Sequence, residues 1–343
     1  MRQIVQNYLL HIEFSKGLAH TKQTLRTLLI GETREFHDIL FHMEKSFFSV
    51  VIPTYNHEVF LEKAVKSVLN QTFNNYEIII VDNYSDDNTE NLIKNLNNKN
   101  IKFIKNRNYG ILAKSRNIGI DQSRSEWIAF LDSDDIWWQD RLKVLFDFIQ
   151  KYNNYDVICT NELVINKINN RKKVWKYGPY QNNFYKILIK YGNCLSTSAS
   201  IVKKKYLVDN QIFFSEEKDF APYEDYDFWM KIAKNNGKFK FLNRVLGEHL
   251  FHQESWGEKN KSLLKKSTLS ILKHHVFNVQ NFTNRKKNLW SHIECDLILH
   301  DIMQLLSSKE YFKAFVALFK LICRYPIKLI IHILFKLKRK FSF

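Results

Sequence analysis

Short runs of valine and isoleucine alternate with amphipathic stretches, and this alternation constrains the fold more than any other feature. The runs "FFSVVIP" (47–53) and "YEIIIVD" (76–82) are nearly continuous, as in parallel strands that are buried on both faces. Between them, residues 58–72 place apolar side chains at helical spacing against a charged back. Strand, helix and strand in this order predict a βαβ unit with a right-handed crossover.

The same alternation continues along the chain. The pattern predicts a helix near 87–97, a strand over 101–106, a helix around 111–123 and a strand over 126–132. We therefore expect an α/β fold over residues 46–257, with an open, mostly parallel sheet flanked by helices. Such sheets bind ligands in the crevice at the carboxyl ends of their strands, so the polar residues at those ends are the candidates for function.

Composition narrows the class of protein. A chain of 343 residues with 45% hydrophobic content is long enough for one large domain, or for a domain with an appendage. The four cysteines are scattered without a CxxC pair, so neither a disulfide framework nor a zinc site is indicated. This usage favours a reducing, cytosolic compartment.

The net charge of +17 is concentrated in one region. Residues 259–343 hold 17 Lys and Arg against 4 Asp and Glu, whereas the rest of the chain is close to neutral. A nucleic-acid reader typically carries its positive charge on the folded face that does the reading. We therefore expect no nucleic-acid partner.

The two ends of the chain differ from its middle. Residues 1–42 show no secretory pattern, and Met43 opens a natural domain start, so this segment is interpreted as either a helical extension or an upstream mis-start. Residues 258–343 are basic and strongly apolar, but charges and Pro326 interrupt the apolar run. This pattern predicts helices that lie on an anionic membrane surface instead of spanning it. The alternative is a helical appendage packed on the body with its charged face in water.

Acidic residues gather at the predicted carboxyl ends of the strands. Each cluster alone is explained by turn and cap preferences, but turn chemistry does not require acids at one end of the sheet. These acids would repel one another, and a divalent cation, Mg²⁺ or Mn²⁺, bound together with a diphosphate would offset their charge. The helix around 111–123 supplies Lys114 and Arg116 for phosphate, and no glycine-rich dinucleotide or P-loop motif is present. The polar residues at the strand ends are Pro53, Thr54, Tyr55 and Asn56, then Asp82, Asn83 and Asp86, then Asp132, Ser133, Asp134 and Asp135.

Five motifs in order carry a resemblance to a known family. They are "SVVIPTYN", "EIIIVDNYSDD", "NYGILAKSRNIGI", "WIAFLDSDDIWWQDRL" and "YEDYDFWMKIA". Over residues 47–257 the chain resembles the family 2 inverting glycosyltransferases, which have the nucleotide-diphospho-sugar binding fold called GT-A.

The resemblance implies roles for individual residues of the motifs. Pro53, Thr54, Asn56 and Asp82 would belong to the donor-binding set, with Thr54 and Asp82 at the pyrimidine base. Lys114 and Arg116 would lie on the diphosphate side, Asp132 at the ribose or metal, and Asp134 at the metal. Asp225 matches the catalytic base. His252, followed by Ser255, resembles a histidine and serine pattern near the metal or diphosphate.

One departure from the family pattern is visible in the second motif. The family commonly has a second acid where this chain has Asn83, and a glycine where it has Tyr84. This puts the shape of the loop around Tyr84 in doubt, while Asp82 keeps its place.

The chemistry of an inverting transfer supports a carboxylate apart from the acidic cluster. A base must take the proton of the acceptor hydroxyl on the face opposite the leaving nucleotide. Asp225 lies far along the chain at a predicted helix start. Complementing a helix N-terminus is the other explanation of the Glu224 and Asp225 pair.

The sequence therefore predicts a metal-dependent inverting glycosyltransferase. It would move a sugar from a UDP- or dTDP-type donor to a hydroxyl of a growing, lipid-linked bacterial surface glycan such as lipooligosaccharide, capsule or O-antigen. We expect it at the cytoplasmic face of the plasma membrane, as a peripheral protein. Two alternatives stay open: a protein-bound or teichoic-type acceptor, and a non-catalytic anionic-lipid-binding or RNA-binding protein on the same fold.

Overall fold

The structure is a computed structural model that describes residues 46–252, 261–331 and 334. The predictions for residues 1–42, for Ser255 and for the basic end of the chain lie outside these residues. The strands are β1 (Phe48–Thr54), β2 (Tyr76–Asp82), β3 (Ile101–Lys105), β4 (Trp127–Phe130), β5 (Ile136–Trp137), β6 (Val157–Asn166), β7 (Arg171–Trp175), β8 (Ser200–Lys203) and β9 (Phe239–Phe251).

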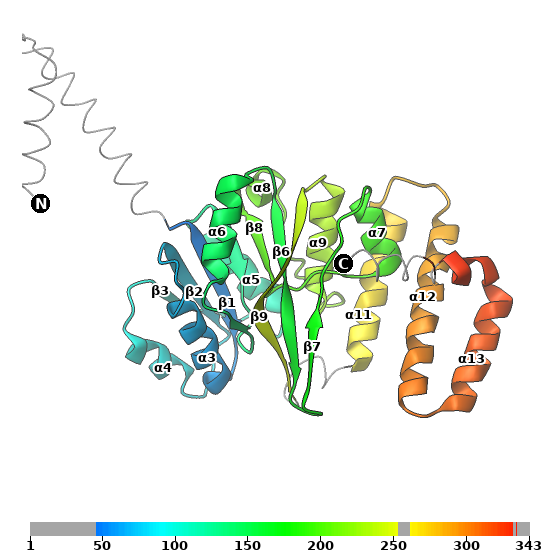
Figure 1. The fold of residues 1–343 in the computed structure, drawn as a ribbon, viewed down its shortest axis with the longest axis horizontal. Coiled ribbons are helices and arrows are strands. Elements are labelled where there is room, and N and C mark those ends of the chain that lie inside the picture. Colours follow the sequence, from blue (N-terminus) through cyan, green and yellow to red (C-terminus); the bar gives the residue numbers. More distant parts are fainter. Residues whose placement is uncertain (1–45, 253–260, 332–333, 335–343) are drawn as a thin grey trace, which may run out of the picture. The chain divides into compact units, whose positions relative to one another are not determined.

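The helices alternate with the early strands as the sequence predicts (Figure 1). Those of the main body are α3 (Glu58–Leu69), α4 (Thr89–Leu96), α5 (Leu112–Gln122), α6 (Arg141–Lys151), α7 (Phe184–Tyr191), α8 (Lys204–Asp209) and α9 (Glu224–Lys234). Those of the C-terminal region are α11 (Lys261–His274), the π-helical turn η1 (His275–Val279), α12 (Lys286–Ser307) and α13 (Tyr311–Arg324).

The described strands form one sheet in the order β3-β2-β1-β4-β8-β6-β9-β5, with β7 paired to β6. β1, β2, β3 and β4 are parallel, as the sequence predicts. β8 then pairs antiparallel with both β4 and β6, so the whole sheet is mixed. Because β4 and β6 both oppose β8, they run in the same direction. The carboxyl ends of β1, β2, β4 and β6 therefore meet at one edge of the sheet.

Alternating strand residues bury both faces of the sheet. Val51 and Phe130 pack with the helices α5, α7 and α9, whereas Val50, Ile52 and Ala129 pack with α3 and α6. Helix α5 comes unusually close to β1, because a Cβ on Gly119 would lie 2.2 Å from Cγ1 of Val51. The glycine of "RNIGI" thus brings the helix that carries Arg116 against the first strand.

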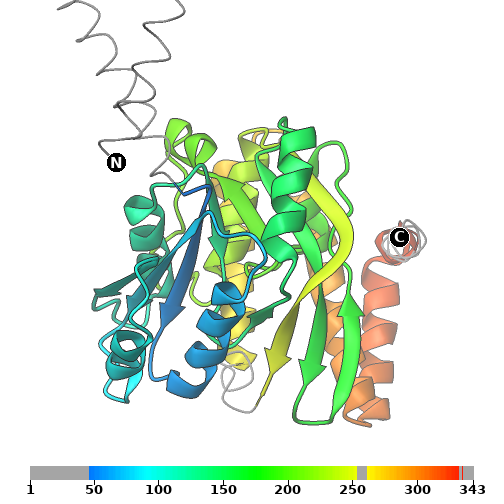
Figure 2. The same cartoon turned by 60° about the vertical axis from the view of Figure 1, so that its left-hand side comes forward.

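The C-terminal helices begin as part of the body and then leave it. Ile271 of α11 and Leu289 and Ile293 of α12 join the core cluster around α9. Further along, α12 and α13 form an antiparallel pair at the side of the body (Figures 1 and 2). This pair has a small core of its own, made of Cys295, Ile302, Ala314 and Leu321.

Candidate active site

The three carboxylates of the acidic loop after β4 lie in two different environments. Asp135 is turned inward: its oxygens accept hydrogen bonds from the Leu250 backbone N–H and from Nδ1 of His249, both at 3.1 Å. The Asp135 side chain is 1% exposed, against 31% for Asp132 and 21% for Asp134. Only Asp132 and Asp134 are therefore open to a ligand, although the sequence places all three within four positions.

The pKa values of the Asp135 and His249 pair follow from its burial. Burial raises the pKa of Asp135 to about 7. Burial opposes the charge on His249, but the Asp135 carboxylate and its hydrogen bond prevail and raise the pKa of His249 to about 10. A protonated His249 thus places positive charge against the acidic loop at neutral pH.

Asp134 and His252, the two predicted metal ligands, lie within hydrogen-bond distance of each other. Nε2 of His252 is 3.2 Å from Oδ2 of Asp134. Burial opposes ionisation of Asp134, but the His252 hydrogen bond and the charges of His249 and His57 lower its pKa. In the described part of the chain no group of three His, Cys, Asp or Glu side chains has the spacing of a complete metal site. A hard cation commonly takes one or two carboxylates and completes its shell with substrate phosphate and water, so this partial ligand set fits one.

Arg116 links the acidic loop to the predicted base. Its guanidinium is 4% exposed, and it donates to Oδ1 of Asp132 at 2.7 Å and to Oε1 of Glu224 at 2.6 Å. Burial opposes its charge, but these carboxylates raise the pKa of Arg116. Both of these contacts go to carboxylates, so its contact with a donor diphosphate stays a prediction. Lys114, two residues earlier, lies 5.2 Å from the centre of the Tyr109 ring and apart from the acids.

Asp225 occupies the first turn of α9, next to Glu224, as the sequence predicts. Its Oδ2 accepts a hydrogen bond from the Asn193 side-chain amide at 3.1 Å. Burial, followed by the charge of Glu224, raises the pKa of Asp225 to about 7. A carboxyl with this pKa is suited to exchange a proton near neutral pH.

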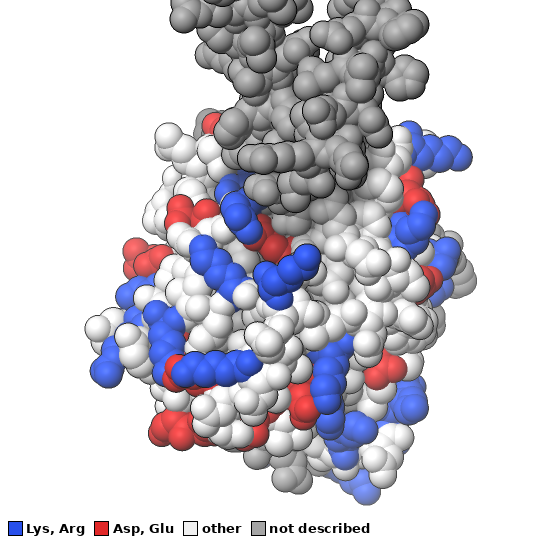
Figure 3. All heavy atoms as spheres, turned by 90° about the vertical axis from the view of Figure 1, so that its left-hand side faces the viewer, with Lys and Arg blue, Asp and Glu red and all other residues white. Residues whose placement is uncertain are grey.

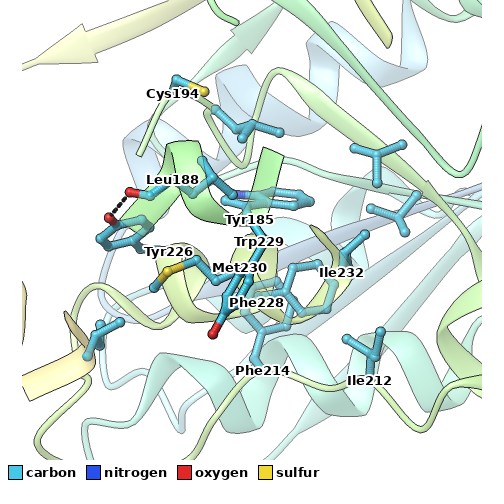
Figure 4. Packing of buried hydrophobic residues seen from close by; sticks show 14 of the residues in the cluster. Tyr185, Leu188, Cys194, Ile212, Phe214, Tyr226, Phe228, Trp229, Met230 and Ile232 are labelled. Carbon is cyan, nitrogen blue, oxygen red and sulfur yellow. Dashed lines mark hydrogen bonds between the residues drawn. The ribbon is translucent and has the colours of Figure 1, made fainter. Parts of the chain in front are cut away.

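Helix α9 is held rigidly behind Asp225. Phe228, Trp229 and Ile232 are fully buried, and the Phe228 ring stacks on Phe214 at 3.9 Å (Figure 4). The Tyr226 hydroxyl donates to the Leu188 carbonyl of α7 at 2.5 Å, the dashed line in Figure 4. The position of Asp225 is therefore fixed by packing on both sides of its helix.

The ends of β1 and β2 form a separate, polar part of the site. Pro53 and Thr54 end β1, and Thr54 lies directly opposite Asp82 of β2. The Thr54 hydroxyl is buried and has no hydrogen-bond partner among the described residues, so it remains available to a ligand. The two loops clamp each other: the Asn56 side-chain oxygen accepts from the Asp86 N–H at 3.0 Å, and Asn56 N–H donates to Ser85 at 2.9 Å.

Tyr84 has a backbone conformation that suits glycine. Its φ is +57°, in the left-handed region that glycine enters without strain. Asp82 still accepts hydrogen bonds from the Ser85 N–H and hydroxyl, at 3.1 and 2.5 Å. A glycine at this position would therefore fit the observed backbone.

Several contributors to the site were not found from the sequence. His57 bonds Ser133 at 2.9 Å, and its ring lies 6.4 Å from that of His252. Its signal was its position, directly after the polar loop that ends β1. Asn193 and His249 had no signal in the sequence, because no spacing rule links either one to an acid.

Together, the parallel half-sheet, the acidic loop and the separate carboxylate on α9 define a GT-A glycosyltransferase. Residues 49–207 match Glycosyl transferase family 2, and the chain belongs to this family. It is an enzyme of the glycosyltransferase class.

Named relatives and a solved structure agree with this assignment. The chain is 30% identical over 200 residues to UDP-Glc:alpha-D-GlcNAc-diphosphoundecaprenol beta-1,3-glucosyltransferase WfgD of Escherichia coli, covering 57% of this chain and 72% of that one. It is 27% identical over 294 residues to GalNAc(5)-diNAcBac-PP-undecaprenol beta-1,3-glucosyltransferase of Campylobacter jejuni, covering 81% and 82%. The crystal structure of S. aureus TarS superposes with a TM-score of 0.53 at 25% identity, covering 73% of this chain and 43% of that one.

Proposed function

We propose that this enzyme is a metal-dependent, inverting glycosyltransferase that uses a pyrimidine nucleotide-diphospho-sugar. Its acceptor is a hydroxyl of a lipid-linked surface glycan. The observation that carries the proposal is Asp225, a carboxyl with a pKa of about 7 on α9, a different element from the loop that carries the open acids Asp132 and Asp134. Two of the relatives are named for acceptors on diphosphoundecaprenol or PP-undecaprenol, and one for UDP-Glc, which supports this choice of substrates.

In the proposed reaction, different residues of the site have different roles. Thr54 and Asp82 hold the pyrimidine base at the ends of β1 and β2. Asp134 and His252 would hold a Mg²⁺ or Mn²⁺ ion, which would offset the negative charge of the departing diphosphate. Asp225 accepts the proton of the acceptor hydroxyl as that oxygen attacks the anomeric carbon.

Arg116 and Glu224 position the base. The Glu224 carboxylate is held by Arg116, which is held in turn by Asp132, so the acidic loop and the start of α9 form one hydrogen-bonded chain. The arrangement ties the base to the donor side of the site.

The α12–α13 pair supports a location on a membrane surface. Phe312, Phe315, Phe319 and Ile322 lie on one face of α13 and are 45–80% exposed. Ile327, Ile330, Ile331 and Leu334 continue this exposed apolar surface. We refer to these eight residues as the apolar face. Among the described helices none is both long and apolar enough to cross a bilayer. An apolar surface with flanking lysines suits the boundary between lipid headgroups and acyl chains.

The test is hydrolysis of a panel of nucleotide sugars, with Mn²⁺ and with a chelator. We expect turnover of one UDP- or dTDP-sugar that stops on chelation. Asp134→Ala should lower it by at least about 100-fold, while Asp209→Ala, an exposed acid on α8, should leave it unchanged. Absence of any turnover by the folded enzyme with every donor would favour a non-catalytic lipid-binding or RNA-binding protein. Turnover that survives chelation would remove the metal from the mechanism.

A further inference from the structure

A hollow of about 450 Å³ lies on the hairpin formed by β6 and β7, outside the site described above. Its walls come from three neighbouring strands. The residues that matter are Asn166 of β6, Arg171, Lys172, Lys173 and Trp175 of β7, and Phe251 of β9.

Strand register places cations and aromatic rings on the same face of this hollow. Arg171 lies opposite Asn166, which lies opposite Phe251, and Lys173 lies two positions along the strand, in the same row as Val164 and His249. Residues directly opposite one another in neighbouring strands point to the same side of a sheet. Trp175 shares this face, and its ring centre lies 6.5 Å from that of Phe251.

The cations of the hollow have no ion-pair partner among the described residues. Arg171, Lys172 and Lys173 are exposed and form no ion pair with any described residue. No Asp or Glu occurs between Glu162 and Asp209 in the sequence. Lysines on an edge strand also deter pairing with other strands, which accounts for charge on β7. It does not account for two aromatic rings placed beside that charge.

His249 connects the hollow to the acidic loop. The Trp175 ring is nearly parallel to the His249 imidazole, with 5.9 Å between their centres. His249 also bonds Asp135, whose neighbour Asp134 contacts His252. The hollow and the open acids thus lie on two sides of one histidine.

The hollow lies on the opposite side of the acidic loop from the nucleotide. In the sheet order, β2 and β1 precede β4, whereas β6, β7 and β9 follow it. The hairpin extends from the same carboxyl edge, because β4 and β6 run in the same direction. A donor that spans from β1 and β2 to the acidic loop leaves the hairpin side to the other substrate.

We propose that this hollow binds the diphosphate group of a lipid-linked acceptor, with Arg171 and Lys173 on the phosphates and Trp175 and Phe251 against the adjoining sugar or prenyl chain. The proposal rests on the proposed function, since it assigns one part of that acceptor to one part of this chain. Guanidinium and ammonium groups bind phosphate oxygens directly, and aromatic faces pack on sugar rings and apolar chains.

The test is calorimetric titration of the full-length enzyme with geranyl diphosphate, in the presence of saturating UDP and Mn²⁺ so that the nucleotide site is filled. We expect binding that weakens with salt. The triple variant Arg171→Gln, Lys172→Gln, Lys173→Gln should raise Kd at least tenfold. A control that removes the same charge from distant exposed sites, Lys99→Gln, Lys151→Gln, Lys234→Gln, should bind as the wild type does. A separate Trp175→Ala variant should weaken geranyl diphosphate more than inorganic pyrophosphate.

The outcomes separate this proposal from the proposed function and from a membrane role. Equal binding by the triple variant and the wild type, or no binding by the wild type, overturns the proposal, whereas UDP binding and donor hydrolysis report independently on the proposed function. The variants should also be sedimented with phosphatidylglycerol vesicles. If the triple variant loses vesicle binding but keeps geranyl diphosphate, the cations serve lipid headgroups and the proposal is wrong.

Discussion

The carboxyl edge of the sheet and the α12–α13 pair differ in whether their side chains have partners within the protein. At the sheet edge, acids that repel one another are matched by Arg116, His249 and His252, so that the site is held together by its own side chains. On α13, the apolar face has no counterpart within the described chain, and Phe312 is 80% exposed.

This difference shows where each region depends on something outside the protein. At the sheet edge, the open carboxylates and the buried Thr54 hydroxyl are available to a ligand. The helix pair lacks a covering surface, because a row of exposed phenylalanines is unfavourable in water. On the opposite side of the body, Figure 3 shows lysines and arginines interspersed with acids, as on an ordinary solvated surface.

The largest effect is expected at the sheet edge, from Asp225→Asn. Loss of the base should lower kcat for transfer by about 10³-fold, while UDP binding stays within about threefold of the wild type, because Asp225 lies apart from Thr54 and Asp82. Transfer assays and UDP calorimetry measure the two effects. Asp219→Asn, at an exposed position, serves as the control. Transfer that persists at more than a small fraction would assign the base elsewhere.

The triple variant Phe312→Ser, Phe315→Ser, Phe319→Ser should weaken the binding of the helix pair to a membrane. Each buried phenylalanine contributes about 1.5–3 kcal/mol of transfer free energy, so vesicle partitioning should fall at least about 100-fold, with donor hydrolysis unchanged. Tyr152→Ser, Val208→Ser, Phe213→Ser removes three exposed apolar side chains from the body and should partition normally. If the triple phenylalanine variant sediments with vesicles as the wild type does, α13 does not hold the protein on the membrane.

A smaller effect is expected in the pH dependence of the activity. Asp225 must be ionised to accept a proton, and its pKa is raised to about 7, so activity should fall as the pH drops through 7. Glu224→Gln removes the neighbouring charge and lowers this pKa, so the acid limb of kcat/KM should move down by about one pH unit. Glu126→Gln, near Lys203, should leave the profile in place. An unmoved limb in the Glu224 variant would assign the titration to another group.

Local pattern was sufficient to predict the first half of the fold. The helices and strands from β1 to β4 follow periodicity, and their apolar residues have no other way to be buried. The sequence did not predict that β8 reverses the sheet direction, or that β6 and β7 form a hairpin. Both depend on pairing between strands distant in sequence, such as Ile128 with Val202, and no local signal encodes that pairing.

The sequence predicted where the residues of the candidate site lie, but not which residues they contact. Strand ends located Thr54, Asp82, Asp132 and Asp134, and the helix start located Asp225. Which of three adjacent aspartates turns inward could not be read from the sequence, because the partner of Asp135 is His249, 114 residues away. The same holds for Arg116 and Glu224, which are 108 residues apart.

The smallest effect tests the loop between β2 and α4. Tyr84 has a φ of +57°, so alanine at this position keeps the strain while glycine relieves it. Tyr84→Gly should therefore unfold at a higher urea midpoint than Tyr84→Ala, by about 1 kcal/mol in unfolding free energy. Both variants lose the contact of the ring with Arg107, whose guanidinium lies 5.0 Å from the ring centre, so this term cancels in the comparison. At a position with ordinary backbone angles alanine is the more stabilising residue, because glycine gains more entropy on unfolding. A more stable alanine variant would therefore mean that the backbone at Tyr84 is not left-handed, and that this loop departs from the course expected of a glycine.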